Sequence, residues 1–194
     1  MTSVASGRPG RPAAATREAA LELATQRFLA AERIDVQAIA RELGLARATM
    51  HRWFQTRETL LGEALAALGE RRLAAIREAT PGKGPAALLA ALDGFNREVA
   101  ATPGMRFLLA QEQERALRIL TSSAGLVQPR VVAAIQRMIE AEVQAGDYAP
   151  SIAPDTLAYA IVRLGEAFIY NDAIGGIRGD TERLREIEAA LLGA

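Results

Sequence analysis

One run of side chains in this sequence is suited to binding DNA, because it presents several hydrogen-bond donors at helical spacing. Met50 and Phe54 are apolar and four positions apart, as on the buried face of a helix. The residues that would then face outward are Arg47, Ala48, Thr49, His51 and Arg52. Guanidinium, hydroxyl and imidazole groups donate to phosphates and to base edges. We therefore predict that this face reads DNA.

The residues just before this run predict the helix and turn that position it. Ile39, Ala40 and Leu43 recur at helical spacing ahead of Gly44. A helix that ends in a left-handed residue favours glycine there, because a Cβ atom makes that conformation costly. Residues 36–54 are therefore predicted to form two short helices joined at Gly44, a helix-turn-helix whose second helix enters the major groove of DNA.

These residues resemble the N-terminal signature of the TetR family of bacterial transcriptional repressors. The similarity covers about residues 14–61, and residues 39–54 and 56–61 carry it in one register. Two residues depart from the family pattern. His51 stands where a tyrosine usually touches the DNA backbone, and an imidazole also donates to phosphate. Ala46 stands where a capping serine is common, so the recognition helix lacks a cap worth about 1 kcal/mol.

The resemblance implies further contacts and an assembly. It places Arg57 in the first turn of the next helix, where the family commonly has a lysine that touches phosphate. We add Trp53, near the end of the recognition helix, to the predicted DNA contacts. A head this small reads only a few base pairs, so a homodimer is expected to place two heads on a near-palindromic operator.

The composition predicts an all-α protein. Half of the 194 residues are hydrophobic but only 5% are aromatic, and small and straight side chains favour closely packed helices. Strand-like alternation between turns is scarce. The total charge is zero, but the first 60 residues hold nine arginines and six acidic residues, so a head of charge +3 precedes a body of charge −3. This asymmetry fits DNA binding by the head, and ordinary scatter would also produce it.

We divide the chain into three parts: an arm, a three-helix head and a larger helical body for ligand binding and dimerisation. Residues 1–13 form a flexible basic arm in which Arg8 and Arg11 either enter a minor groove or remain solvated. Residues 14–60 form the helix-turn-helix domain, with Thr16, Asp35 and Thr56 as predicted helix N-caps. Residues 61–194 form the body. Turn signals separate its expected helices at about 60–79, 85–100, 104–120, 128–145, 154–174 and 180–192.

The last two helices are the candidates for the dimer contact, because in the TetR family the last two long helices commonly pair as a four-helix bundle. Their apolar residues would face either a partner or the internal core, and the sequence leaves both open: Ile161, Leu164, Phe168, Leu184, Ile187 and Leu191.

A polar stripe on the helix at 154–174 indicates a ligand site in the body. Tyr159, Arg163, Glu166 and Tyr170 fall at i, i+4, i+7 and i+11, so a regular helix places them on one face. This face either lines a mostly apolar cavity, where a few polar groups orient a ligand, or is a solvated face or dimer seam. The other candidates come from two earlier helices, where the core would also claim apolar residues: Phe95, Met105, Phe107 and Gln111.

Three segments are similar to one TetR subgroup, the lactone-responsive repressors that control degradation of quorum-sensing signals. They are residues 118–125, 155–163 and 171–186. This similarity implies that the inducer is a small lactone.

Other function classes lack their characteristic residues. The chain has no cysteine, one histidine and no glycine motif of phosphate-loop, dinucleotide-binding or serine-hydrolase type, so we expect no enzyme, no cofactor and no metal. The N-terminus lacks an apolar signal segment and no apolar run is long enough for a membrane span, which predicts a cytoplasmic protein.

We predict a ligand-responsive transcriptional regulator, a repressor, that a small-molecule inducer releases from its double-stranded DNA operator. Two alternatives remain: an adaptor whose body binds another protein, and a transcriptional activator.

Overall fold

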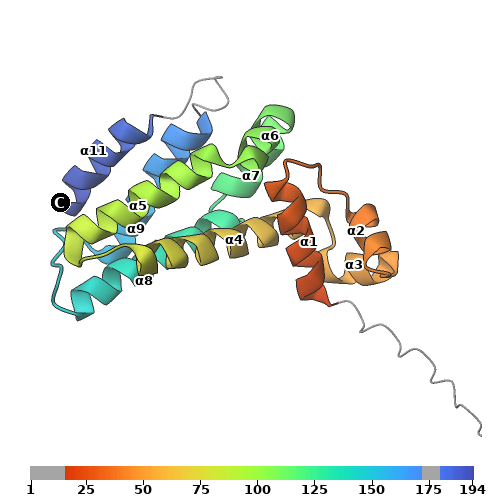
Figure 1. Ribbon diagram of the computed structural model, residues 1–194, viewed down its shortest axis with the longest axis horizontal. Coiled ribbons are helices and arrows are strands. Elements are labelled where there is room, and N and C mark those ends of the chain that lie inside the picture. Colours follow the sequence, from red (N-terminus) through yellow and green to blue (C-terminus); the bar gives the residue numbers. More distant parts are fainter. Residues whose placement is uncertain (1–15, 172–179) are drawn as a thin grey trace, which may run out of the picture.

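One long helix connects a small helical head to a larger helical body (Figure 1). The computed structural model describes residues 16–171 and 180–194, and within them there is no strand. The head and the long helix comprise α1 (Arg17–Leu29), α2 (Val36–Glu42), α3 (Arg47–Phe54) and α4 (Arg57–Ala79). The body adds α5 (Gly84–Ala101), α6 (Pro103–Gln111), α7 (Gln113–Thr121), α8 (Val127–Gln144), α9 (Pro154–Glu166), the π-helix η1 (Ala167–Asn171) and α11 (Thr181–Leu192). The predicted all-α class is confirmed.

Side chains at the helix starts set the boundaries of the head, as predicted. The side chains of Thr16, Asp35 and Thr56 accept hydrogen bonds from backbone N–H groups in the first turns of α1, α2 and α4. Ala46, the N-cap residue of α3, provides no side-chain hydrogen bond. Each cap contributes about 1 kcal/mol, because it satisfies a backbone donor that the helix itself leaves unpaired.

The turn of the helix-turn-helix is a Schellman motif. Gly44 has φ of +63°, its N–H donates to the carbonyl of Arg41, and the N–H of Leu45 donates to the carbonyl of Ala40. This pair of bonds ends α2 and requires a left-handed residue at Gly44. The predicted role of the glycine is confirmed.

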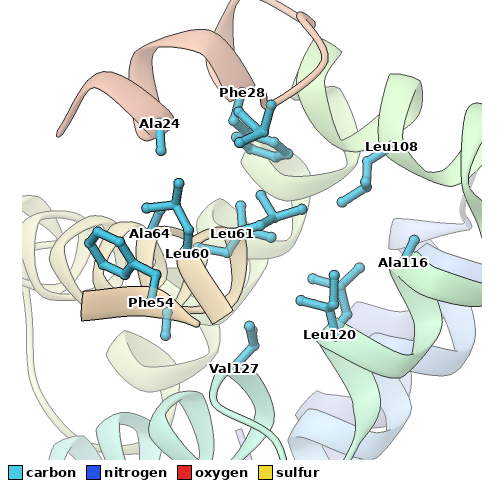
Figure 2. Packing of buried hydrophobic residues seen from close by; sticks show 14 of the residues in the cluster. Ala24, Phe28, Phe54, Leu60, Leu61, Ala64, Leu108, Ala116, Leu120 and Val127 are labelled. Atoms are coloured by element: carbon cyan, nitrogen blue, oxygen red, sulfur yellow. The ribbon is translucent and has the colours of Figure 1, made fainter. Parts of the chain in front are cut away.

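Head and body share one hydrophobic core. Side chains from α1, α4, α6, α7 and α8 meet in it, among them Phe28, Leu61, Leu108 and Leu120 (Figure 2). Each such side chain contributes about 1.5–3 kcal/mol when it is fully buried. A second core joins α4, α5, α8, α9 and α11 at the far end of the body. The position of the head therefore depends on contacts with the body helices.

Two predicted helices differ from the structure. The helix expected at 104–120 is divided into α6 and α7 at Glu112, which has φ of −141° and ψ of 45°. The helix expected at 154–174 is α-helical only to Glu166 and continues as the π-helix η1, in which each turn holds an extra residue. Its predicted end falls in residues 172–179, and the basic arm falls in residues 1–13, both outside the described residues.

One carboxyl group is fully buried between two body helices. Glu188 on α11 is 0% exposed, and the amide nitrogen of Asn96 on α5 donates to its two oxygens at 3.0 and 3.2 Å. Burial raises the pKa of Glu188 to about 7, since the bond from Asn96 only partly offsets the lost hydration and nearby Asp93 adds to the rise. The body therefore holds a group that titrates near neutral pH.

The substitution Glu188→Gln should remove a pH dependence of stability. The folded-state pKa is raised from 4.5 to about 7, so the carboxyl favours folding when protonated, and stability is lost as the pH rises through this range. Between pH 5 and pH 8 the free energy of unfolding should fall about 3 kcal/mol further in the wild type than in the variant. Urea denaturation at the two pH values measures this. Glu186→Gln, at an exposed position of the same helix, is the control and should follow the wild type.

Candidate DNA-binding surface and ligand cavity

Helix α3 presents its polar residues to solvent. Met50 and Phe54 are each 1% exposed and attach the helix to the shared core. On the opposite face Thr49 is partly exposed and four residues are exposed: Arg47, Ala48, His51 and Arg52. The structure thus brings the predicted DNA-reading residues to one surface of the head, where their donors are accessible.

The edges of this surface add detail that the sequence did not supply. Trp53 is partly buried, and its ring meets the ring of Phe54 edge-on at 6.2 Å between centroids, so it supports the core as well as reaching the surface. A shallow hollow beside α3 is lined by Gln37, Arg47 and His51, among others. Gln37, in the first turn of α2, gave no sequence signal because only the packing of α2 on α3 brings it near them.

Arg57, a predicted DNA contact, forms hydrogen bonds with other residues of the same chain. Its Nη1 and Nη2 donate to the two carboxylate oxygens of Glu112 at 2.6 and 2.8 Å, and its Nε donates to the carbonyl of Ile34 at 2.6 Å. The two side chains are only 17% and 14% exposed. In this conformation the guanidinium joins the start of α4 to the junction of α6 and α7, and the expected phosphate contact stays a prediction.

Glu112 is the centre of a small ionic network at this junction. Arg115 donates to it at 2.9 Å and also pairs with Glu58 at 2.8 Å. The guanidinium of Arg57 is the main cause that lowers the pKa of Glu112, with Arg115 adding to it against the cost of burial. The carboxylate is ionised at neutral pH, and charge-assisted bonds of this kind are among the stronger ones in proteins.

The other end of α6 contacts the head through a glycine. A Cβ atom at Gly104 would lie 1.8 Å from the carbonyl oxygen of Phe28, so any other residue would push α6 away from the end of α1. Helix α6 is therefore attached to the head at both ends, at Gly104 and at Glu112. Figure 1 shows α6 and α7 beside α1, between head and body.

An apolar cavity of about 250 Å³ lies where head and body meet. Three predicted ligand residues line it: Phe95 on α5, Met105 on α6 and Tyr170 on η1. The head contributes Phe28 and Leu29 from the end of α1. The sequence did not predict Phe28 and Leu29 as ligand residues, because they fall within residues 14–60, which it assigns to the helix-turn-helix domain.

The long helix α4 forms another wall that the sequence did not reveal. Leu68, Gly69 and Arg72 line the cavity, as does Glu98 on α5. Arg72 and Glu98 pair through two bonds, at 2.5 and 2.6 Å. The charges among these lining residues thus compensate each other, and the remaining lining is mostly apolar.

A smaller cavity of about 40 Å³ shares Phe95 and Tyr170 with the first. Glu166 lines it and is 8% exposed, and the amide nitrogen of Gln128 on α8 donates to both its oxygens, at 2.8 and 3.0 Å. Burial raises the pKa of Glu166, although Gln128 and Arg163 act in the opposite direction. Burial also raises the pKa of Tyr170, so its hydroxyl stays protonated.

The other four predicted ligand residues line neither cavity. Phe107 and Gln111 lie on α6, and Gln111 is exposed. Tyr159 is 50% exposed, and Arg163 is exposed and donates to Glu166 at 2.8 Å. The structure divides the predicted stripe: its first half lies at the surface, and only where α9 passes into η1 do Glu166 and Tyr170 reach the cavities.

The described residues include neither a metal site nor a membrane-spanning helix. No cluster of histidine, aspartate and glutamate there has an arrangement that would hold a metal ion. No described helix combines the length and apolar character needed to cross a membrane.

Comparisons with known proteins agree with this geometry. The transcriptional repressor QsdR of the TetR family, from R. erythropolis, is 27% identical over 92% of this chain and 94% of its own, with a TM-score of 0.83. The TetR family repressor AlkX from Dietzia sp. strain DQ12-45-1b, implicated in biodegradation of n-alkanes, shares the fold at 21% identity over 93% of this chain and 99% of its own, with a TM-score of 0.61. No curated protein sequence is similar enough to this chain to match it. The model of the tetracyclin repressor-like C-terminal domain matches residues 83–193, more than half of the chain, which therefore belongs to the TetR family of transcriptional regulators.

Proposed function

We propose that this protein is a ligand-responsive repressor that binds a near-palindromic operator as a homodimer and leaves it when a small, uncharged, mostly apolar ligand enters the large cavity. One observation carries the proposal: the wall of that cavity includes the head helix α1 as well as the body helices. A ligand there would touch the DNA-binding part directly. A tightly filled body would instead favour an adaptor that binds another protein.

The proposal divides the chain into a DNA-binding head, residues 14–60, and a ligand-binding and dimerisation body, residues 61–194. In the head, Arg47 and Thr49 on the exposed face of α3 read base edges, and His51 and Arg52 contact bases or phosphates. Trp53 supports them from the edge of the core.

The burial of the last helices suggests which residues form the dimer contact. Ile161 and Leu184 are 2% and 0% exposed and belong to the interior. Leu164, Phe168 and Ile187 are partly exposed and, among the described residues, belong to neither core. We assign these three to the interface between the two copies, because burying them against a partner would remove apolar surface from water.

The coupling between ligand and DNA would pass through helix α6. Met105 on α6 lines the cavity, and the ends of α6 contact the head at Gly104 and Glu112. A ligand that fits better with α6 displaced would move α1 and the start of α4, and so change the spacing of the two heads. Ligand and DNA would then weaken each other's binding reciprocally.

A small lactone is the ligand that the sequence similarities favour. Residues 118–125 and 155–163, which resemble the lactone-responsive subgroup, lie in α7 with the following turn and in α9. Half of the third segment, residues 171–186, falls in the undescribed part of the chain. A lactone is uncharged, and the lining of the large cavity holds a compensated pair, Arg72 with Glu98, as its charged residues.

Binding to DNA that flanks the protein's own gene tests the first half of the proposal. Saturable binding that exceeds binding to random DNA, and that falls steeply with salt, is expected. Arg47→Ala should lose about 1–3 kcal/mol on the specific site and much less on random DNA, because base contacts carry the sequence preference. Arg71→Ala, at an exposed position of α4, is the control and should bind normally. An equal loss on all sequences would leave Arg47 only a phosphate contact.

Filling the cavity tests the second half. An alanine Cβ at Gly69 would lie no nearer than 3.6 Å to Val131, so Gly69→Ala should fold, gain about 0.5–1 kcal/mol from the better helix former and still bind the neutral fluorescent probe N-phenyl-1-naphthylamine. Gly69→Leu should occupy the cavity and weaken probe binding at least tenfold, while operator binding remains. Unchanged probe binding by the leucine variant would place the ligand elsewhere.

Glu112→Gln tests the attachment of α6 to the head. The variant should lose about 2 kcal/mol of stability at pH 7, because Arg57 loses its ionised partner. Since the pKa of Glu112 is lowered from 4.5, the stabilising effect exists above that pH, and the difference from wild type should shrink as the pH falls below it. Glu114→Gln, two residues away and exposed, is the matched control. A loss of the same size in both variants would argue against the attachment.

A further inference from the structure

Two buried amide side chains line the small cavity, and within the described residues each uses only its nitrogen. Asn96 is 8% exposed and Gln128 is 2% exposed. The nitrogen of Asn96 donates to Glu188, and that of Gln128 donates to Glu166 and to the carbonyl of Thr121. No described group donates to Asn96 Oδ1 or to Gln128 Oε1. The amide oxygen of a buried side chain usually accepts a hydrogen bond. Neither of these two oxygens is a fully covered atom without a partner, so each has accessible space in which it can meet a donor.

The orientation of the Gln128 amide follows from its neighbours. The carbonyl of Thr121 lies 3.0 Å from the amide nitrogen, and a carbonyl only accepts hydrogen bonds. The nitrogen of Gln128 must therefore face Thr121, and the oxygen is the atom left over. The ionised form of Glu188 likewise accepts from the nitrogen of Asn96, which leaves Oδ1 without a partner there.

The small cavity has the size of a functional group. A water-sized sphere needs about 10–15 Å³, so a volume of about 40 Å³ has room for a small end group such as a hydroxyl or an amide. Tyr170 lines both cavities, and its hydroxyl has no hydrogen-bond partner among the described residues. A ligand that occupies both spaces would pass this side chain.

The charges around the small cavity select against an ionised group. Glu166 lines the cavity, and its ionised form would repel a carboxylate. The oxygens of Glu166 and Glu188 already accept hydrogen bonds from the protein, and an ammonium group would lose its hydration in a mostly apolar space. An uncharged donor avoids both costs and can donate to a free amide oxygen.

We propose that the small cavity is a polar subsite that binds an uncharged end group of the ligand: a hydroxyl through Gln128 Oε1, or an amide NH2 group through Gln128 Oε1 and Asn96 Oδ1. The apolar remainder of the ligand lies in the large cavity. This inference rests on the proposed function, and it narrows the ligand class to neutral amphiphiles with a hydrogen-bond donor at one end.

Two isomeric probes separate the subsite from the large cavity. 1-Octanol and 1-methoxyheptane have the same atoms, but only the alcohol donates a hydrogen bond. On the wild-type protein, 1-octanol should displace N-phenyl-1-naphthylamine at roughly tenfold lower concentration, since satisfying a buried acceptor is worth about 1–3 kcal/mol. This comparison needs no variant. Octanoate and octylammonium, measured alongside, should displace the probe less well than the alcohol.

Matched variants then locate the effect. Gln128→Met keeps the length of the side chain but removes its amide, and it should reduce the advantage of the alcohol to near onefold. Gln136→Met is the same change two turns later on α8, at a residue whose amide bonds to Glu140, and it should keep the advantage. Circular dichroism and thermal unfolding verify that both variants fold.

The outcomes distinguish this inference from the proposed function. Equal displacement by the two isomers, or an advantage that survives Gln128→Met, would overturn the subsite while the large cavity stands. Tightest binding of either ion would also overturn it. If N-phenyl-1-naphthylamine does not bind and none of the four compounds does, both the subsite and the ligand-responsive function are wrong.

Discussion

Helix α6 is attached to the head at both of its ends, and the placement of the head depends on these two contacts. At one end Gly104 allows the helix to meet the carbonyl of Phe28, where no Cβ atom fits. At the other end Glu112, the first residue after α6, accepts two hydrogen bonds from Arg57. Met105, one residue beyond the glycine, lines the large cavity. A displacement of α6 must therefore stretch one of these contacts or carry part of the head with it.

The shared core makes this attachment stiff. Protein interiors are close-packed, so they transmit a displacement and do not absorb it. Residues of α1, α4, α6 and α7 pack in a single cluster that crosses the boundary between head and body (Figure 2). In the proposed repressor, this packing carries the signal, and the ionic network at Glu112 sets how strongly the resting position is favoured.

The sequence predicts what adjacent residues determine. Caps at Thr16, Asp35 and Thr56 and the left-handed Gly44 follow from short patterns, and the structure confirms them. Glu112, where the predicted helix breaks, accepts hydrogen bonds from an arginine 55 residues earlier in the chain, and helical spacing across 104–120 does not predict a contact at that distance.

The polar stripe predicted from the sequence differs from the arrangement in the structure for a related reason. Its spacing is regular, but whether a residue on it is covered depends on neighbouring helices and on the start of η1. The head's share of the cavity was missed because Phe28 has the same pattern whether it fills a core or borders a space.

The free energy available in the cavity matches what a switch of this kind requires. Filling an apolar cavity recovers about 24 cal/mol per Å³, so about 250 Å³ provides at most roughly 6 kcal/mol. Reversing a two-state equilibrium from 99:1 to 1:99 takes about 5.5 kcal/mol of differential binding. A ligand that binds both states equally would supply no differential binding free energy, so the wall of the cavity must move when the ligand binds. The walls on α5 and α8 are backed by the second core, whereas Leu29 at the end of α1 is 44% exposed. The wall that the head contributes is therefore the easiest to displace. A ligand slightly too large for the cavity would move the DNA-binding helices first.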